Sequence, residues 1–164
     1  MRLFLTYCSR KKRNAILPPD KLYVSPRIDK FTQYCKNKAL NWAIISAKYG
    51  FFFPEESKEP YNVTFRNDRE CWLGIQIVEN SVKISKEDSC SKLKGLVSKI
   101  KAQAIEHSVD KLAFYTWSLM QPKCYLSLMH FLFDSCERYH SWQELLKCIE
   151  RNWHIKVITK LNLC

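Results

Sequence analysis

Residues that interrupt regular structure are scarce in this chain, which has only 3 Gly and 6 Pro among 164 residues. That scarcity excludes collagen-like sequences and disordered segments rich in Pro and Gly. The sequence also contains no apolar run near the ~20 residues of a membrane-spanning helix. A hydrophobic fraction of 46% with 13% aromatic residues predicts one packed domain over residues 1–164, without a membrane partner.

Several widespread functional motifs are missing as well. There is no Gly-rich dinucleotide fingerprint, no P-loop and no Gly-x-Ser-x-Gly turn, which leaves the common nucleotide-binding and hydrolase classes without support. The sequence has no Cys-x-x-Cys pair, and the spacing of Cys124, His130, Cys136 and His140 is typical of no zinc site. We therefore expect neither a metal nor a cofactor.

The eight cysteines have no secretory context. The first residues, MRLFLTYCSRKKR, have too short an apolar run for a signal peptide, and their charges follow that run instead of preceding it. We therefore expect a cytoplasmic protein with reduced thiols, Cys8 and Cys35 among them. Several of these thiols would be buried as small hydrophobic groups.

Acidic residues are outnumbered by basic ones, 16 against 27, for a formal charge of +11. The excess is largest near the beginning, where residues 1–60 carry 12 basic and 5 acidic side chains. A positive field of this kind attracts nucleotides, nucleic acids or anionic lipid. Many small intracellular proteins are basic too, so charge alone does not separate a phosphate-binding surface from an ordinary solvated one.

Apolar strands alternate with amphipathic helices along the chain. Strand-like runs occur at 2–7, 42–46, 112–116 and 155–158, with a weaker one between 71 and 82. Helical spacing or capping signals occur at 26–38, 86–107, 124–139 and 141–152. This alternation predicts a single α/β domain with a mainly parallel sheet covered by helices on both faces. The strands at 2–7 and 42–46 would be parallel neighbours.

A polar loop follows each of the first two strands. Residues 8–12, CSRKK, come after the first strand, and residues 46–50, SAKYG, come after the second. Both loops would emerge at the carboxyl edge of a parallel sheet, where ligands usually bind. Each offers a hydroxyl and a lysine, and Cys8 adds a thiol, so together they could hold a phosphate or activate a nucleophile. The plainer interpretation of Cys8 is a buried thiol at a strand end.

Aromatic and lysine-rich stretches each have two interpretations. The aromatic residues between 49 and 61 lie near basic side chains, as base stacking beside a phosphate would require, but they also fit an ordinary core. Gly50 predicts a turn with a positive φ. The lysines from Lys83 to Lys101 fit a solvated helix face, and a track for a phosphate backbone is the alternative.

Four segments together resemble a known family: YCSRKK at 7–12, LYVSP at 22–26, AIISAKYGFFFPEE at 43–56 and EPYNVTF at 59–65. Their order and spacing are similar to those of the YaaA-like family, which includes a peroxide-stress protein and many small uncharacterised domains. The matching positions are Cys8, Ser9, Lys12, Tyr23, Ser25, Pro26, Ser46, Lys48, Tyr49, Gly50, Pro60 and Tyr61. The Cys-x3-Lys step is more loosely similar to a domain of archaeosine synthase, which acts on a deazaguanine base in transfer RNA.

The resemblance implies a pocket that binds nucleic acid or a nucleotide and modifies a nucleobase. The catalytic groups would be Cys8, Ser9 and Lys12. The ligand-binding residues would be Tyr23, Ser25, Ser46, Lys48, Tyr49, Gly50, Pro60 and Tyr61. The main alternative is a non-catalytic nucleic-acid-binding protein that uses its basic surface, and a protein-interaction module has less support. The Gly-rich hairpin of a helix-hairpin-helix, which resemblance to YaaA itself would imply, is absent.

Overall fold

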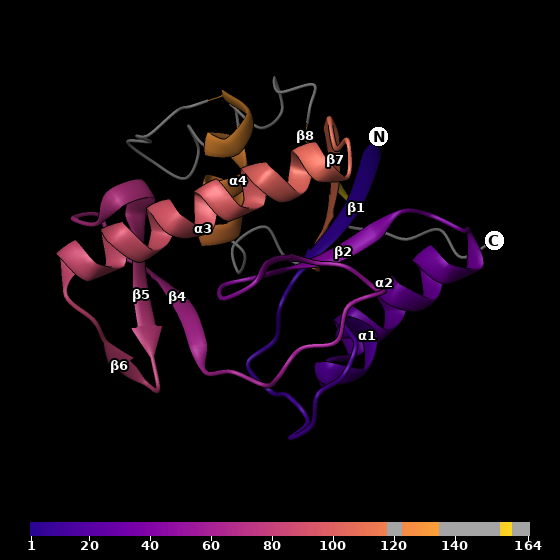
Figure 1. Cartoon of the computed structure of the whole chain (residues 1–164), viewed down its shortest axis with the longest axis horizontal. Coiled ribbons are helices and arrows are strands. Elements are labelled where there is room, and N and C mark those ends of the chain that lie inside the picture. Colours follow the sequence, from indigo (N-terminus) through magenta and orange to yellow (C-terminus); the bar gives the residue numbers. More distant parts are fainter. Residues whose placement is uncertain (118–122, 135–154, 159–164) are drawn as a thin grey trace.

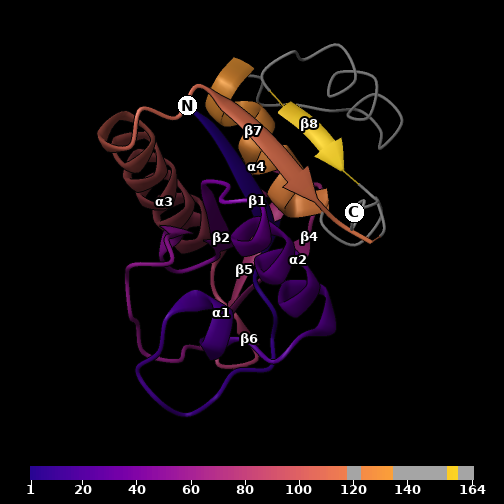
Figure 2. The same ribbon diagram turned by 90° about the vertical axis from the view of Figure 1, so that its right-hand side faces the viewer.

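The computed structural model describes residues 1–117, 123–134 and 155–158, and in it one long helix lies across two β-sheets (Figure 1). The larger sheet has the strand order β3-β2-β1-β7-β8. Its strands are β1 (Arg2–Tyr7), β2 (Trp42–Ser46), β3 (Gly50–Phe52), β7 (Lys111–Tyr115) and β8 (Ile155–Ile158). β1 pairs in parallel with β2 and β7, and β7 pairs in parallel with β8, whereas β3 joins β2 antiparallel. Figure 2 shows β7 between β1 and β8.

A separate sheet of three short strands follows β3 along the chain. It contains β4 (Val63–Asn67), β5 (Ile75–Glu79) and β6 (Val82–Lys83), all antiparallel. A 3-10 helix, η1 (Trp72–Gly74), lies between β4 and β5. β5 and β6 are joined by Asn80 and Ser81, which both have a positive φ, as a two-residue hairpin turn requires.

The predicted fold class is wrong. Instead of a single mainly parallel sheet covered by helices on both faces, the chain forms a mixed five-stranded sheet and a second sheet that is antiparallel throughout. The cause lies between residues 47 and 85, where the 3-10 helix η1 is the only helical element. Parallel pairing needs a crossover connection of about a dozen residues or more, so strands joined by shorter links pair antiparallel. The narrower prediction that the strands at 2–7 and 42–46 are parallel neighbours is confirmed.

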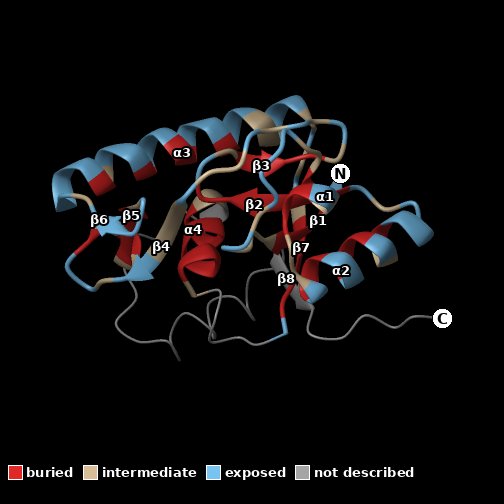
Figure 3. Ribbon diagram, turned by 90° about the horizontal axis from the view of Figure 1, so that it is seen from below, coloured by how far each residue is buried: buried red, intermediate tan, exposed pale blue. Residues whose placement is uncertain are grey.

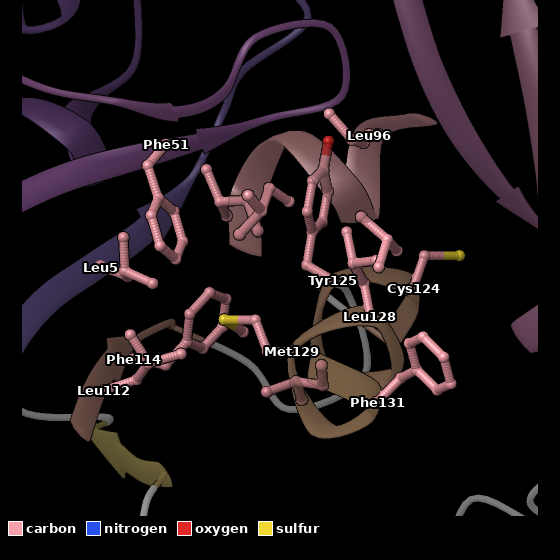
Figure 4. Close-up of a cluster of buried hydrophobic side chains, with 14 of the residues drawn as sticks. Leu5, Phe51, Leu96, Leu112, Phe114, Cys124, Tyr125, Leu128, Met129 and Phe131 are labelled. Atoms are coloured by element: carbon pink, nitrogen blue, oxygen red, sulfur yellow. The ribbon is translucent and has the colours of Figure 1, made fainter. Parts of the chain in front are cut away.

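Side chains of the larger sheet alternate between two cores on opposite faces. In β2, Ala43 and Ile45 belong to one cluster of buried residues, whereas Trp42 and Ile44 belong to the other. This alternation follows from the two-residue repeat of a strand, and it makes the red strands of Figure 3 buried on both sides. The larger cluster connects the sheet to the second sheet and to two helices, and Figure 4 shows part of it around Tyr125.

The helices of the described residues are α1 (Pro19–Leu22), α2 (Pro26–Asn37), α3 (Lys86–Glu106) and α4 (Lys123–Asp134). Serine side chains cap two of them: the backbone N–H of Ile28 donates to Ser25 Oγ at 3.5 Å, and that of Asp88 donates to Ser85 Oγ at 3.0 Å. The helices predicted at 26–38 and 86–107 are confirmed to within one residue. The predicted helix at 124–139 is described as far as Asp134, and the one at 141–152 lies outside the described residues.

In the part of the chain that the structure describes, no helix combines the length and the apolar character needed to cross a bilayer. Cys8 and Cys35 both have free thiols.

Candidate functional site

The loop after β1 begins at Cys8 and is held in place by a buried arginine. The Cys8 N–H donates to the Ile45 carbonyl at 3.0 Å and so extends the pairing of β1 with β2. Arg27, which is 6% exposed, donates to the Tyr7 carbonyl at 2.8 Å, to the Cys8 carbonyl at 3.5 Å and to the Thr6 hydroxyl. Its guanidinium carbon also lies 3.5 Å from the centroid of the Tyr7 ring. Because Arg27 is the second residue of α2, the helix fixes the backbone that presents Cys8.

Hydroxyl groups from three segments meet at the end of β2. Ser46 Oγ donates to Tyr61 Oη at 2.7 Å, and the hydroxyls of Tyr61 and Tyr23 share a further hydrogen bond of 2.7 Å. Ser46 Oγ in turn accepts the N–H groups of Lys48 at 3.1 Å and Tyr49 at 3.0 Å. Burial raises the pKa of both Tyr23 and Tyr61 well above the usual value of a phenol. Both hydroxyls therefore stay protonated and keep their hydrogen bonds.

Lys12 lies over this hydroxyl network. Its Nζ is 4.1 Å from the ring centroid of Tyr61 and 5.6 Å from that of Tyr23, and it donates to the Arg10 carbonyl at 3.3 Å. Burial lowers the pKa of Lys12 below 10.5, and the nearby Cys8 thiol partly opposes that shift. The ammonium group is therefore held with little solvation, which suits it to pair with an anion.

The Cys8 thiol lies among phenols. Its Sγ is 3.0 Å from the hydroxyl of Tyr125, a buried residue of α4. Burial raises the pKa of Tyr125 well above its usual value, and Cys8 raises it further. Cys8 also packs, together with Tyr61, against the buried cluster that contains Tyr23, so α4, the loop after β1 and the hydroxyl network share one site.

Lys12 and Tyr61 line a groove of about 1140 Å³, which is formed by the loops after β1 and β2, the segment before β4, the second sheet and α3. The basic side chains in its lining are Arg10, Lys12, Arg13, Lys48, Arg66, Lys92 and Lys99. One acidic residue, Glu79, faces these seven, and it forms an ion pair with Lys92. The groove therefore has a strongly positive field, which favours an anionic ligand.

Three lysines surround the ring of Tyr49 beside the groove. The Nζ atoms of Lys48, Lys58 and Lys99 lie 5.3, 5.8 and 5.8 Å from its centroid, and they come from three separate segments. Glu56 pairs with Lys58 at 3.0 Å and offsets part of this charge. Like charges drawn together in this way repel, and a bound anion would relieve that repulsion.

The predicted site residues divide into three groups. The first group, Lys12, Lys48, Pro60 and Tyr61, lines the groove. The second group, Cys8, Tyr23, Ser46 and Tyr49, does not line the groove; Tyr23, Ser46 and Tyr49 contact Tyr61, and Cys8 contacts Tyr125. The third group, Ser9, Ser25 and Gly50, does not line the groove.

Two residues of the third group have structural roles. Ser25 caps α2. Gly50 has a φ of 74°, and a Cβ at this position would lie 2.5 Å from Gln103 Oε1 and 2.9 Å from Ile100 Cγ1. The predicted positive φ of Gly50 is confirmed, and it serves the close packing of β3 against α3. Ser9 is half-buried next to Cys8.

Several site residues were not predicted. The basic side chains Arg10, Arg13, Arg66, Lys92 and Lys99 line the groove, whereas Arg27 and Tyr125 support Cys8 from behind. Arg66 belongs to a strand that the sequence pattern did not indicate. A sequence signal was available for Lys92 and Lys99, because the lysines from Lys83 to Lys101 were interpreted as a solvated helix face or, alternatively, as a track for a phosphate backbone.

Among the described residues, no three His, Cys, Asp or Glu side chains lie close enough together to hold a metal ion. Of the potential zinc ligands considered, His130 is a buried residue of α4, and Cys136 and His140 lie outside the described residues.

The fold and the site together define an α/β protein with a thiol and a hydroxyl network behind a basic groove. Comparison with protein families shows that the chain belongs to a family of unknown function, DUF6884, whose model matches residues 3–111. The matched region runs from β1 to the start of β7 and includes every predicted site residue. No curated protein and no solved structure matches the chain.

Proposed function

We propose that this protein binds nucleic acid or a nucleotide in the groove beside Tyr61. The observation that carries the proposal is the lining of the groove, in which seven Lys and Arg side chains face a single Glu. Phosphate groups are the common anions that such a charge selects, and they supply most of the affinity of proteins for nucleic acids.

The ring of Tyr61 adds a surface for a base. It lines the groove, its hydroxyl is tied to Ser46 and Tyr23, and Lys12 lies over it at 4.1 Å. An aromatic ring held beside ammonium groups is the combination that stacks a base next to its phosphate. A lipid headgroup would use the same charge, but it has no base to stack on the ring.

Binding of fluorescein-labelled oligonucleotides, followed by fluorescence anisotropy, tests this function. Lys12→Ala and Lys48→Ala should each weaken binding several-fold, and affinity should fall as salt rises. Lys30→Ala is the matched control, because this exposed lysine of α2 does not line the groove. Equal losses in all three variants would show that total charge matters and the groove does not, which would contradict the proposal.

A second candidate function is modification of a nucleobase, and the surroundings of Cys8 favour it. The thiol lies 3.0 Å from the Tyr125 hydroxyl and interacts with Lys12, whose ammonium group lies over a residue of the groove. Cys8 would act as the nucleophile, Lys12 as a proton donor or charge stabiliser, and Ser9 as a neighbouring polar group. The resemblance to the YaaA-like family and to archaeosine synthase, itself a prediction, points the same way. We also propose that the protein is cytoplasmic.

Binding and catalysis can be separated with Cys8→Ala. A binder retains its full affinity for the oligonucleotide in this variant, whereas an enzyme retains affinity but loses any change that mass spectrometry detects in the nucleosides of an incubated RNA or DNA. Alkylation of Cys8 by iodoacetamide gives an independent readout, since a base held at the site should slow it. Alkylation at an unchanged rate in the presence of saturating oligonucleotide would contradict a reacting base at Cys8.

A further inference from the structure

Helix α3 carries two pairs of lysines with the same spacing on different sides. Lys92 and Lys99 line the groove, and Lys94 and Lys101 do not. Lys94 and Lys101 instead point toward the opposite flank of the helix, where each Nζ lies 5.6 Å from the centroid of an aromatic ring, Trp72 in one case and Phe131 in the other. The geometry of an α-helix explains the division, because residues seven apart lie on almost the same side and residues two apart do not.

The groove-facing pair forms a row longer than a single phosphate. Seven residues of helix rise by roughly 10 Å, so the two ammonium groups lie too far apart to share one phosphate and would contact two different phosphates of a strand. Lys99 also reaches the Tyr49 ring, beside which Lys48 lies on the other wall. The positive charge thus extends along α3 and across to the loop after β2.

We propose that the groove holds a single strand of nucleic acid, with Lys92 and Lys99 on two different phosphates and Tyr61 against a base. This inference rests on the function proposed above and narrows its ligand from any nucleotide to a polynucleotide. The groove volume, about 1140 Å³, exceeds the ~300–1,000 Å³ of pockets that enclose one small ligand.

The shape of the site selects a single strand over a duplex. Proteins that read a duplex insert a convex helix or ribbon into its groove, whereas here the protein is concave and its aromatic ring lies within the concavity. A base can reach Tyr61 only when it is unpaired, and a positive groove with an aromatic platform is how single strands are bound without sequence preference.

The ion pair between Lys92 and Glu79 does not prevent this contact. The side chains are 51% and 30% exposed, and pairs this exposed to solvent contribute little to stability. A phosphate can therefore replace the carboxylate at Lys92, while Glu79 limits how far the strand extends toward β5.

The test uses the full chain and labelled homopolymers of thymidine and of uridine, from one to about six nucleotides long, with a duplex of similar length. Affinity should rise with length beyond a single nucleotide, and the single strand should bind more tightly than the duplex. Lys92→Ala/Lys99→Ala should weaken binding of the longest oligomer about tenfold and reduce the slope of log affinity against log salt by about 1.4. Lys94→Ala/Lys101→Ala removes the same charge from the same helix and should change the affinity by less than about twofold and leave the salt slope unchanged.

The outcomes separate the two proposals. If the mononucleotide binds as tightly as the longest oligomer, and Lys12→Ala still weakens it, the polynucleotide inference falls and the proposed function stands. Tighter binding of the duplex would also overturn the inference that the groove holds a single strand. Equal losses of affinity in the two double variants would overturn the phosphate contacts assigned to Lys92 and Lys99. Absence of binding to every probe would overturn both proposals.

Discussion

The hydroxyls of Tyr23 and Tyr61 share a hydrogen bond of 2.7 Å, although 38 residues separate them in the sequence. This bond connects the segment that precedes α2 to the segment that precedes β4, directly behind the basic groove. Ser46 donates to the same Tyr61 hydroxyl at 2.7 Å, so the end of β2 is the third segment of this hydrogen-bonded network. Among the described residues, Tyr61 supplies the aromatic ring that lines the groove, and two hydroxyls from two other segments set the position of that ring.

Tyr61→Phe separates the ring of Tyr61 from its hydroxyl. Removing Oη leaves the hydroxyls of Ser46 and Tyr23 without this partner, so we expect the free energy of unfolding to fall by about 1–2 kcal/mol. The ring stays under Lys12, and oligonucleotide affinity should change little. Tyr61→Leu removes the ring as well and should weaken affinity by about 1–3 kcal/mol, the usual contribution of one stacked base. Equal affinities of the Phe and Leu variants, measured by anisotropy, would exclude stacking at Tyr61.

Arg27 supports the site without lining the groove. Arg27→Met should lower the free energy of unfolding by roughly 2–4 kcal/mol, because the buried guanidinium donates to two carbonyls and one hydroxyl that would lose their partner. Arg27→Lys should recover only part of the loss, since one ammonium cannot reproduce the planar fork. Urea denaturation measures both variants, and wild-type stability in Arg27→Lys would show that charge alone suffices there.

The part of the site that the sequence pattern indicated consists of groups near strand ends. Cys8, Lys12 and Ser46 follow β1 and β2, and parallel pairing of those strands brings their loops to one sheet edge. Tyr23 and Tyr61 were placed by family resemblance, and the structure brings them into the same hydrogen-bonded network.

The remainder depends on packing that local patterns do not encode. Tyr125 reaches Cys8 from 117 residues away, and Lys92 and Lys99 form a groove wall only because α3 lies across both sheets. The prediction of the fold class was wrong for a related reason. No strand was expected at β3, in the aromatic stretch between 49 and 61, or at β4, so the strands that make the sheets mixed and antiparallel were not anticipated.

Two glycines should respond in opposite ways to alanine. At Gly50 the φ of 74° and the short distances from a Cβ to Gln103 and Ile100 make Gly50→Ala destabilising, by about 1–2 kcal/mol for the backbone alone and more for the clash. Gly95 lies inside α3 with nothing within 4 Å of a Cβ, so Gly95→Ala should stabilise by about 0.5–1 kcal/mol. Thermal denaturation of the two variants checks the contrast, which a loss of stability in Gly95→Ala would contradict.

Lys12 links stability to pH in a direction that its lowered pKa determines. In the unfolded chain its pKa returns to 10.5, so between the folded value and 10.5 the unfolded state binds more protons than the folded state. The contribution of Lys12 to the free energy of unfolding therefore rises with pH across that window. Below the window, where both states are protonated, the folded protein bears the full cost of burying the charge.

Lys12→Met removes this titration while keeping an unbranched side chain of similar length. The free energy of unfolding of the wild type minus that of the variant should therefore increase from neutral pH toward 10.5, as measured by urea denaturation at a series of pH values. The difference cancels the titration of the tyrosines and other lysines, which both proteins share. A difference that is independent of pH, or that decreases as pH rises, would show that Lys12 is not desolvated in the folded protein.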